Sequence, residues 1–96
     1  MKFEWDINKA ELNIKIHGVS FEEAAETFYD PKAVYGVDKE HSESEERFYV
    51  IGFSSRRLLF VIYVERIDSD TIRIITARKA EAKYQKEYTK ENYGEQ

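Results

Sequence analysis

Arginine, the side chain best suited to bind a phosphate, is concentrated in one stretch of the chain. Five of the six arginines lie within 23 residues: Arg56, Arg57, Arg66, Arg73 and Arg78. Lys79 directly follows Arg78. The guanidinium group is planar and permanently charged, and its fork of donors matches the oxygens of a phosphate. The pattern therefore predicts a local anion-binding surface.

Two further side chains can carry protons near such a surface. Glu65 directly precedes Arg66, and His17 directly precedes Gly18. A positioned acid or base contributes about 10² to 10⁴ in rate when a reaction requires proton transfer. Each residue also has a purely structural explanation, since a histidine at a helix C-terminus interacts favourably with the helix dipole and a charged pair often solvates the end of a strand.

Length and composition limit the classes of protein. The 96 residues suit one domain, residues 1–96, and the chain has no cysteine, which excludes disulfides, cysteine-zinc sites and thiol catalysis. No apolar run resembles a signal peptide or approaches the length of a membrane span, so we expect a cytoplasmic protein without membrane contact. His41 lies in an acidic run, so we expect it to be exposed to solvent; a metal site formed by His41 with Glu40 and Glu43 is the less favoured alternative.

The net charge of −4 hides an asymmetry between the two halves of the chain. Residues 1–53 carry 6 basic and 12 acidic side chains, net −6, whereas residues 54–96 carry 9 and 7, net +2. Nucleic-acid binders are usually basic overall, but a basic surface can coexist with an acidic remainder.

Two helices are predicted near the start of the chain, after a short strand at "FEW". The first runs from the N-cap Asp6 to Gly18, with Ile7, Ala10 and Ile14 on one buried stripe that also holds His17. The second begins at "SFEE", a capping box in which Ser20 and Glu23 cap each other reciprocally, and it ends before the only proline.

The second half of the chain reads as strands followed by a helix. "AVYGV" is a short strand, "DKEHSESEE" a solvated loop, and "RFYVIGF", "LLFVIYVER" and "TIRIITAR" form an antiparallel meander. A last helix packs through a stripe of Ala80, Tyr84 and Tyr88. The predicted fold class is a compact α+β domain, with helices on one side of an antiparallel sheet.

The last hairpin determines where its charges point. A loop at residues 67–70 pairs Arg66 with Thr71, and strict alternation then pairs Val64 with Arg73 and Leu59 with Arg78. This register places Arg66 and Arg73 on one face of the sheet, and Glu65 and Arg78 on the other.

Together these segments resemble a known family. "FEWD", "HGVSFEEA", "ERF" and "IRIITARKA" occur in the order and spacing seen in the BrnT family of type II toxins, and the resemblance covers nearly the whole chain. Members often have a basic residue directly before the His-Gly pair, where this chain has Ile16 and, one position earlier, Lys15.

The resemblance implies a RelE-like fold, ribonuclease activity that arrests translation, and neutralisation by a cognate BrnA-like antitoxin in a hetero-oligomer. Metal-independent cleavage of RNA needs no cofactor; it needs proton carriers and cations at the phosphate. The residues expected in the catalytic set are His17, Glu65, Arg66 and Arg78. Those expected to bind the RNA phosphates are Arg73, Lys79, Arg56 and Arg57.

Two other functions fit the residues. One is a partner-binding module without catalysis, such as a degenerate toxin, which the acidic balance and the exposed loop favour. The other is an RNA- or DNA-binding domain that does not cleave, whose affinity falls steeply with salt.

Overall fold

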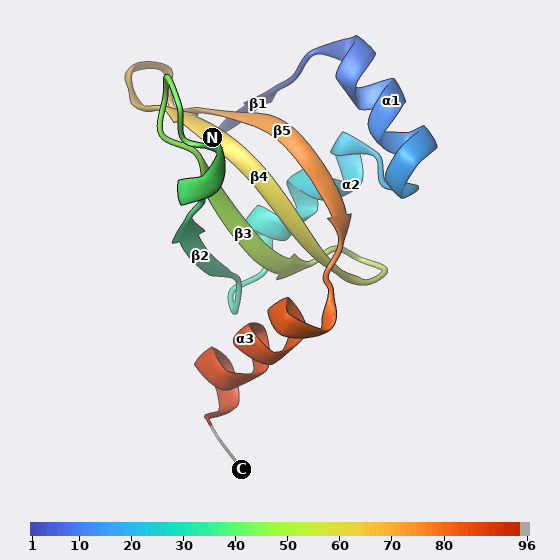
Figure 1. Ribbon diagram of the computed structural model, residues 1–96, viewed down its shortest axis with the longest axis vertical. Helices are drawn as coiled ribbons and strands as arrows, with labels where there is room; N and C mark the ends of the chain where they lie inside the picture. Colours follow the sequence, from blue (N-terminus) through green and yellow to red (C-terminus); the bar gives the residue numbers. More distant parts are fainter. Residues whose placement is uncertain (95–96) are drawn as a thin grey trace.

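The computed structural model describes residues 1–94, which form a five-stranded sheet with helices packed on it (Figure 1). The elements in chain order are β1 (Lys2–Glu4), α1 (Ile7–His17), α2 (Phe21–Glu26), β2 (Val34–Val37), β3 (Phe48–Phe53), β4 (Leu58–Arg66), β5 (Thr71–Lys79) and α3 (Ala82–Tyr93). Short 3-10 turns lie at Thr27–Tyr29, Lys39–His41 and Ile67–Ser69. Among the described residues, no helix is long and apolar enough to cross a membrane.

The sheet has the strand order β1-β5-β4-β3-β2. The predicted meander is confirmed, because β2, β3, β4 and β5 pair antiparallel in sequence. The prediction of a purely antiparallel sheet is wrong at one edge, where β1 runs parallel to β5. The connection through α1 and α2 carries the chain from β1 at one edge to β2 at the other, so β1 pairs with the last strand of the meander and not with the first.

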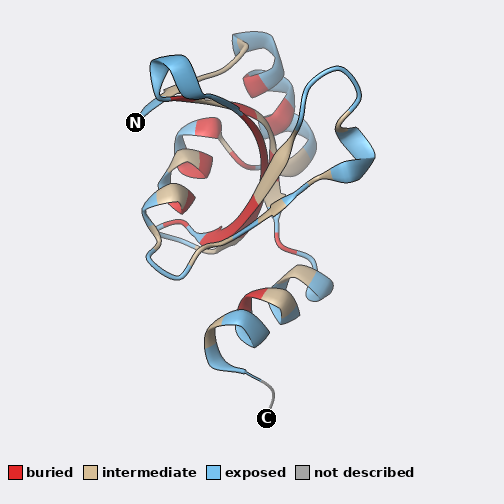
Figure 2. Ribbon diagram, turned by 90° about the vertical axis from the view of Figure 1, so that its left-hand side faces the viewer, coloured by how far each residue is buried: buried red, intermediate tan, exposed pale blue. Residues whose placement is uncertain are grey.

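Helices cover both faces of the sheet, whereas the sequence predicted them on one (Figure 2). One core packs α1 and α2 against the sheet and includes Phe21, Val61 and Tyr63. The second lies on the opposite face, where Tyr88 of α3 packs with Phe60 and neighbouring residues. The nearly continuous apolar run of β4 is the reason, because a strand that is apolar on both faces needs cover on both.

Helix α1 is turned away from its predicted orientation. Ile7 and Ile14 are 69% and 51% exposed, whereas Ala10 and Asn13 are buried. The Asn13 side-chain amide donates to the Ala77 carbonyl over 2.8 Å, and its oxygen accepts from the Ala77 N–H over 3.2 Å. Because β1 pairs only with the first three residues of β5, the later edge of β5 is free, and Asn13 satisfies its backbone.

A bulge in β5 changes the predicted register of the last hairpin. The pairs Arg66–Thr71 and Val64–Arg73 are confirmed, but the ladder shifts between Ile62 and Tyr63, so Arg78 lies opposite Phe60 instead of Leu59. Since Phe60 belongs to the α3-side core, Arg78 lies on the α3 face together with Arg66 and Arg73. The prediction that Glu65 and Arg78 share a face is therefore wrong.

Candidate functional site

Three segments meet at one corner of the domain: the end of α1, the end of β5 and the β3–β4 turn. Arg57 Nη2 donates to the Gly18 carbonyl over 2.8 Å, and the Ala80 N–H donates to the Leu58 carbonyl over 3.1 Å. These contacts gather five of the predicted site residues, here called the basic corner: His17, Arg56, Arg57, Arg78 and Lys79.

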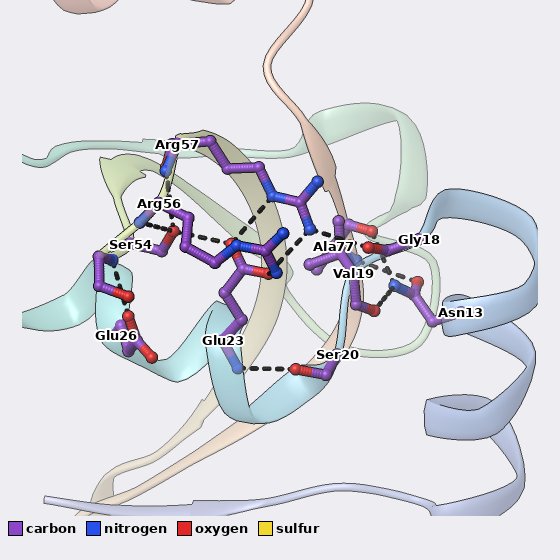
Figure 3. A network of polar contacts seen from close by, with 11 residues as sticks. Asn13, Gly18, Val19, Ser20, Glu23, Glu26, Ser54, Arg56, Arg57 and Ala77 are labelled. Atoms are coloured by element: carbon purple, nitrogen blue, oxygen red, sulfur yellow. Dashed lines mark hydrogen bonds and ion pairs between the residues drawn. The ribbon is translucent and has the colours of Figure 1, made fainter.

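A buried carboxylate organises the basic corner (Figure 3). Glu23 is 7% exposed and accepts from Arg57 Nε at 3.0 Å and Nη2 at 2.8 Å, and from Ser54 Oγ at 2.7 Å. The hydrogen bonds from Arg57 lower the pKa of Glu23, and Glu23 in turn raises the pKa of Arg57. Arg57 is thus held in an internal ion pair, which fixes the turn against α2.

This network also corrects the expected capping box. Ser20 Oγ accepts from the Glu23 N–H over 3.0 Å, as predicted. The carboxylate of Glu23 turns to Arg57 instead of reaching back to Ser20, because a buried carboxylate is stabilised most by a bidentate guanidinium. The capping pattern correctly located the start of the helix, but it did not indicate that Glu23 pairs with Arg57.

The other cations of the basic corner are more open. The Arg56 side chain is 70% exposed, with Nη1 3.8 Å from Glu23 Oε1, and Lys79 is exposed at the end of β5. His17 is partly exposed and lies one helical turn beyond Asn13. Residues four apart share a helix face, so His17 continues along the edge of β5 that Asn13 begins to cover.

Arg78 is held by weak contacts and keeps an unused donor. Its guanidinium carbon lies 5.9 Å from the centre of the Phe60 ring, and Nη1 lies 3.8 Å from Glu81 Oε1. Its Nε is buried without a hydrogen-bond partner among the described residues. Tyr84 of α3 stacks on the same Phe60 ring with centroids 4.0 Å apart, which limits the space available to the Arg78 stem.

The remaining predicted residues lie toward the other end of β4 and β5. Arg66 Nε and Arg73 Nη1 both donate to Glu4 Oε2, over 2.9 and 3.0 Å, and these bonds lower the pKa of Glu4. Glu65 lies on the opposite face of the sheet, the face of Tyr63. The structure therefore joins Arg66 and Arg73 through Glu4, and it places His17 and Arg78 on segments that meet at the basic corner, His17 on the α1–α2 side and Arg78 on the α3 side. Glu65 belongs to neither group.

Sequence reasoning missed Asn13 and Glu4. Asn13 follows Ala10 by three positions and precedes His17 by four, so its spacing is that of the buried stripe. Because asparagine is polar, its residue type instead favoured a surface position. Glu4 could be located only after β1 was known to pair with β5.

The described residues contain no group of three or more metal-binding side chains of the His, Cys, Asp and Glu types. His41 Nδ1 lies 2.8 Å from Asp38 Oδ2, so its neighbour is a carboxylate other than the two considered from the sequence.

Comparison with known proteins gives one family match. Residues 5–83 match the family model described as the ribonuclease toxin BrnT of type II toxin-antitoxin systems. No curated protein matches the chain. The match begins directly after β1 and covers both N-terminal helices, the whole meander and the start of α3, and hence every residue of the basic corner. The chain therefore belongs to the BrnT family of ribonuclease toxins.

Proposed function

We propose that this chain is an active endoribonuclease whose cleavage of cytoplasmic RNA arrests translation, and that a BrnA-like antitoxin neutralises it. We also propose that the basic corner is the cleavage site and works without a metal ion. The support is the family together with the meeting of three segments, the end of α1, the β3–β4 turn and the end of β5, that carry His17, Arg78 and Lys79.

The chemistry needs three events at one phosphate. The 2′-hydroxyl loses a proton and attacks phosphorus, the bond from phosphorus to the 5′-oxygen breaks, and that oxygen takes a proton. His17 is assigned to proton transfer, and Arg78 to the charge that develops on the phosphoryl oxygens. Lys79 and Arg56 add positive charge, while Arg57 acts as a positioning residue through Glu23.

The observation that carries this assignment is the state of Arg78. A buried guanidinium N–H without a partner costs free energy in the absence of a ligand, and a phosphate oxygen is the acceptor it fits best. At the end of an edge strand, Arg78 on one face and Lys79 on the other are both within reach of a group that approaches the edge.

Arg66 and Arg73 fit a supporting role. They share the α3 face with Arg78, and Arg73 lies about 16 Å from Arg78 along β5, at roughly 3.3 Å per residue. They are assigned to phosphates further along the same strand of RNA. Glu65 is left out of the proton-transfer set because it lies on the opposite face.

The test is cleavage of a single-stranded RNA oligonucleotide by purified protein in EDTA. Arg78→Ala and His17→Ala are each expected to lower the rate by about 10² or more, because one removes a transition-state donor and the other a proton carrier. Lys39→Ala, at an exposed loop position, is the matched control and should keep the wild-type rate.

Two results would count against the proposal. One is an equal rate in wild type and in Arg78→Ala, with both folded by circular dichroism; Arg78→Lys, which keeps the charge and the stem, separates loss of the guanidinium fork from loss of packing on Phe60. The other is harmless induced expression of the folded wild-type chain in cells that lack the antitoxin, which would favour a partner-binding module.

A further inference from the structure

The end of the sheet opposite the basic corner carries a groove on the α1–α2 face. It has a volume of about 450 Å³, and helical cover ends at Phe28, which forms one wall. Met1 and four strands contribute the rest of its lining, which is mostly aromatic and aliphatic: Tyr35, Gly36 and Val37 of β2, Phe48 of β3, Tyr63 and Glu65 of β4, and Ile72 of β5. We call this set the aromatic groove.

Two polar groups in the aromatic groove have no partner. The Tyr63 side chain is 3% exposed, and its hydroxyl makes no hydrogen bond to any described residue. Glu65 makes no ion pair or side-chain hydrogen bond in the described part of the chain either. Among the described residues Arg78 Nε is the buried side-chain atom left without a hydrogen bond, so the Tyr63 hydroxyl is open to solvent in the groove and available to a ligand.

The surroundings of the aromatic groove are acidic. Glu65 and Phe48 also line an adjoining cleft of about 540 Å³ that contains Glu45, Glu46 and Asp68. Two of the nearby cations are already engaged, because Arg66 is paired with Glu4 and the terminal amino group lies 2.9 Å from Asp70. Arg47, which precedes Phe48, offsets one of the carboxylates. The local field therefore attracts a positive group and repels a polyanion.

We propose that the aromatic groove is the docking site for a basic segment of the antitoxin, and that an arginine or lysine of that segment lies with its stem along the rings and its charge at Glu65. This inference rests on the proposed function, since it takes the antitoxin as the partner. A long cationic side chain is the occupant that fits both the apolar walls and the carboxylate. The Tyr63 hydroxyl can accept from its head group or donate to a backbone carbonyl.

RNA fits this groove poorly. A base can stack on exposed aromatic rings, but the phosphates on either side of it would lie against Glu65, Glu45 and Glu46. The aromatic groove and the basic corner thus select opposite charges at opposite ends of one sheet, so an antitoxin segment and an RNA substrate need not compete for the same side chains.

The first test uses a short peptide that alternates valine with arginine, blocked at both ends, and its neutral match in which citrulline replaces arginine. The arginine peptide should bind, with NMR shift changes centred on the backbone of Phe48, Tyr63 and Ile72. Replacing arginine by citrulline, or Glu65 by Gln in the protein, should each weaken binding about tenfold or more.

Matched variants locate the effect. Tyr35→Ala removes an aromatic wall and should weaken the arginine peptide, whereas Tyr29→Ala, an exposed tyrosine outside the groove, should not. Glu40→Gln is the control for Glu65→Gln. Equal affinity for the arginine and citrulline peptides, unchanged affinity in Glu65→Gln, or shift changes centred on α3 would each overturn the proposal.

The second test asks whether the antitoxin uses the groove. Antitoxin purified on its own should displace the arginine peptide, and Tyr35→Ala should weaken the toxin–antitoxin complex. An antitoxin that binds and leaves the peptide in place would overturn the docking site, while the ribonuclease function would stand. RNA cleavage by the same Tyr35→Ala protein tests the proposed function separately. Loss of cleavage in Glu65→Gln with unchanged peptide binding would assign Glu65 to catalysis and overturn its role in the groove.

Discussion

The Glu23 network at the basic corner and the polar side chains of the aromatic groove differ in how they are paired. At the basic corner, Glu23, Ser54 and Arg57 satisfy one another within the chain. At the aromatic groove, Tyr63 and Glu65 have no side-chain partner among the described residues. Internal pairing fixes geometry, whereas an unused hydrogen-bonding group keeps binding capacity for another molecule. We therefore expect substitutions in the Glu23 network to change stability, and substitutions at the groove to change binding.

The largest effect is expected from breaking the buried pair at the corner. Glu23→Ala should lower the free energy of unfolding by about 3 kcal/mol, because it leaves the partly buried Arg57 guanidinium without its carboxylate. Urea denaturation measures this loss. Glu22→Ala, at the neighbouring exposed position of α2, should stay within about 0.5 kcal/mol. Similar losses for both variants would mean that the pair does not organise the corner.

The next effect concerns the contact between α1 and the free edge of β5. Asn13→Ala removes the partner of both Ala77 backbone groups and of the Val19 carbonyl, and should cost about 2 kcal/mol. Asn8→Ala on the exposed side of α1 gains the same helix propensity without losing those bonds, so it is the matched control. A loss in Asn13→Ala no larger than in the control would show that the edge of β5 is satisfied by water.

A pair of tyrosines compares used and unused hydroxyls directly. The Tyr88 hydroxyl donates to Asp30 Oδ2 over 2.9 Å, so Tyr88→Phe should cost about 1 kcal/mol. Tyr63→Phe should stay within about 0.5 kcal/mol although Tyr63 is as deeply buried, because its hydroxyl bonds nothing in the free chain. Thermal unfolding of the two variants in parallel provides the measurement, and a larger loss in Tyr63→Phe would contradict the comparison.

The smallest change is expected in RNA binding at the Glu4 cluster. Glu4→Gln removes the carboxylate that neutralises Arg66 and Arg73, so RNA should bind more tightly. The slope of log K against log salt should steepen by about 0.7 for each further phosphate engaged. Glu11→Gln, exposed on α1, serves as the control. An unchanged slope would remove Arg66 and Arg73 from the path of the RNA.

Local patterns in the sequence were sufficient for most elements. The Ser20 cap, the meander and the packing of Tyr84 and Tyr88 of α3 follow from local patterns, and each is confirmed. Ala80, the third residue of the predicted stripe, precedes the helix. The parallel pairing of β1 was not predictable in this way, because it depends on a partner nearly seventy residues away. The placement of α3 on the second face depends on the two-sided apolar character of β4, a pattern that does not indicate which helix supplies the second cover.

The candidate site was predictable in its residue types and only partly in its grouping. The cluster of arginines was visible in the sequence. The sequence does not distinguish an arginine that forms an internal ion pair from one that is available to a ligand, and Arg57 is paired with Glu23, 34 positions away. The separation of Glu65 from Arg78 depends on which face each side chain takes, and strict alternation gave the wrong answer because the ladder contains one additional residue.

That additional residue, Ile75, determines which face of the sheet each later side chain of β5 points to. Ile74 and Ala77 are three positions apart and yet share one core, which an uninterrupted strand does not permit. Deletion of Ile75 alone would restore a continuous ladder while every later side chain kept its direction. Loss of any other single residue between Thr71 and Ala77 would either remove the bulge or exchange inward and outward side chains. The strand therefore tolerates a change in length at one position, Ile75, which lies three residues before Arg78.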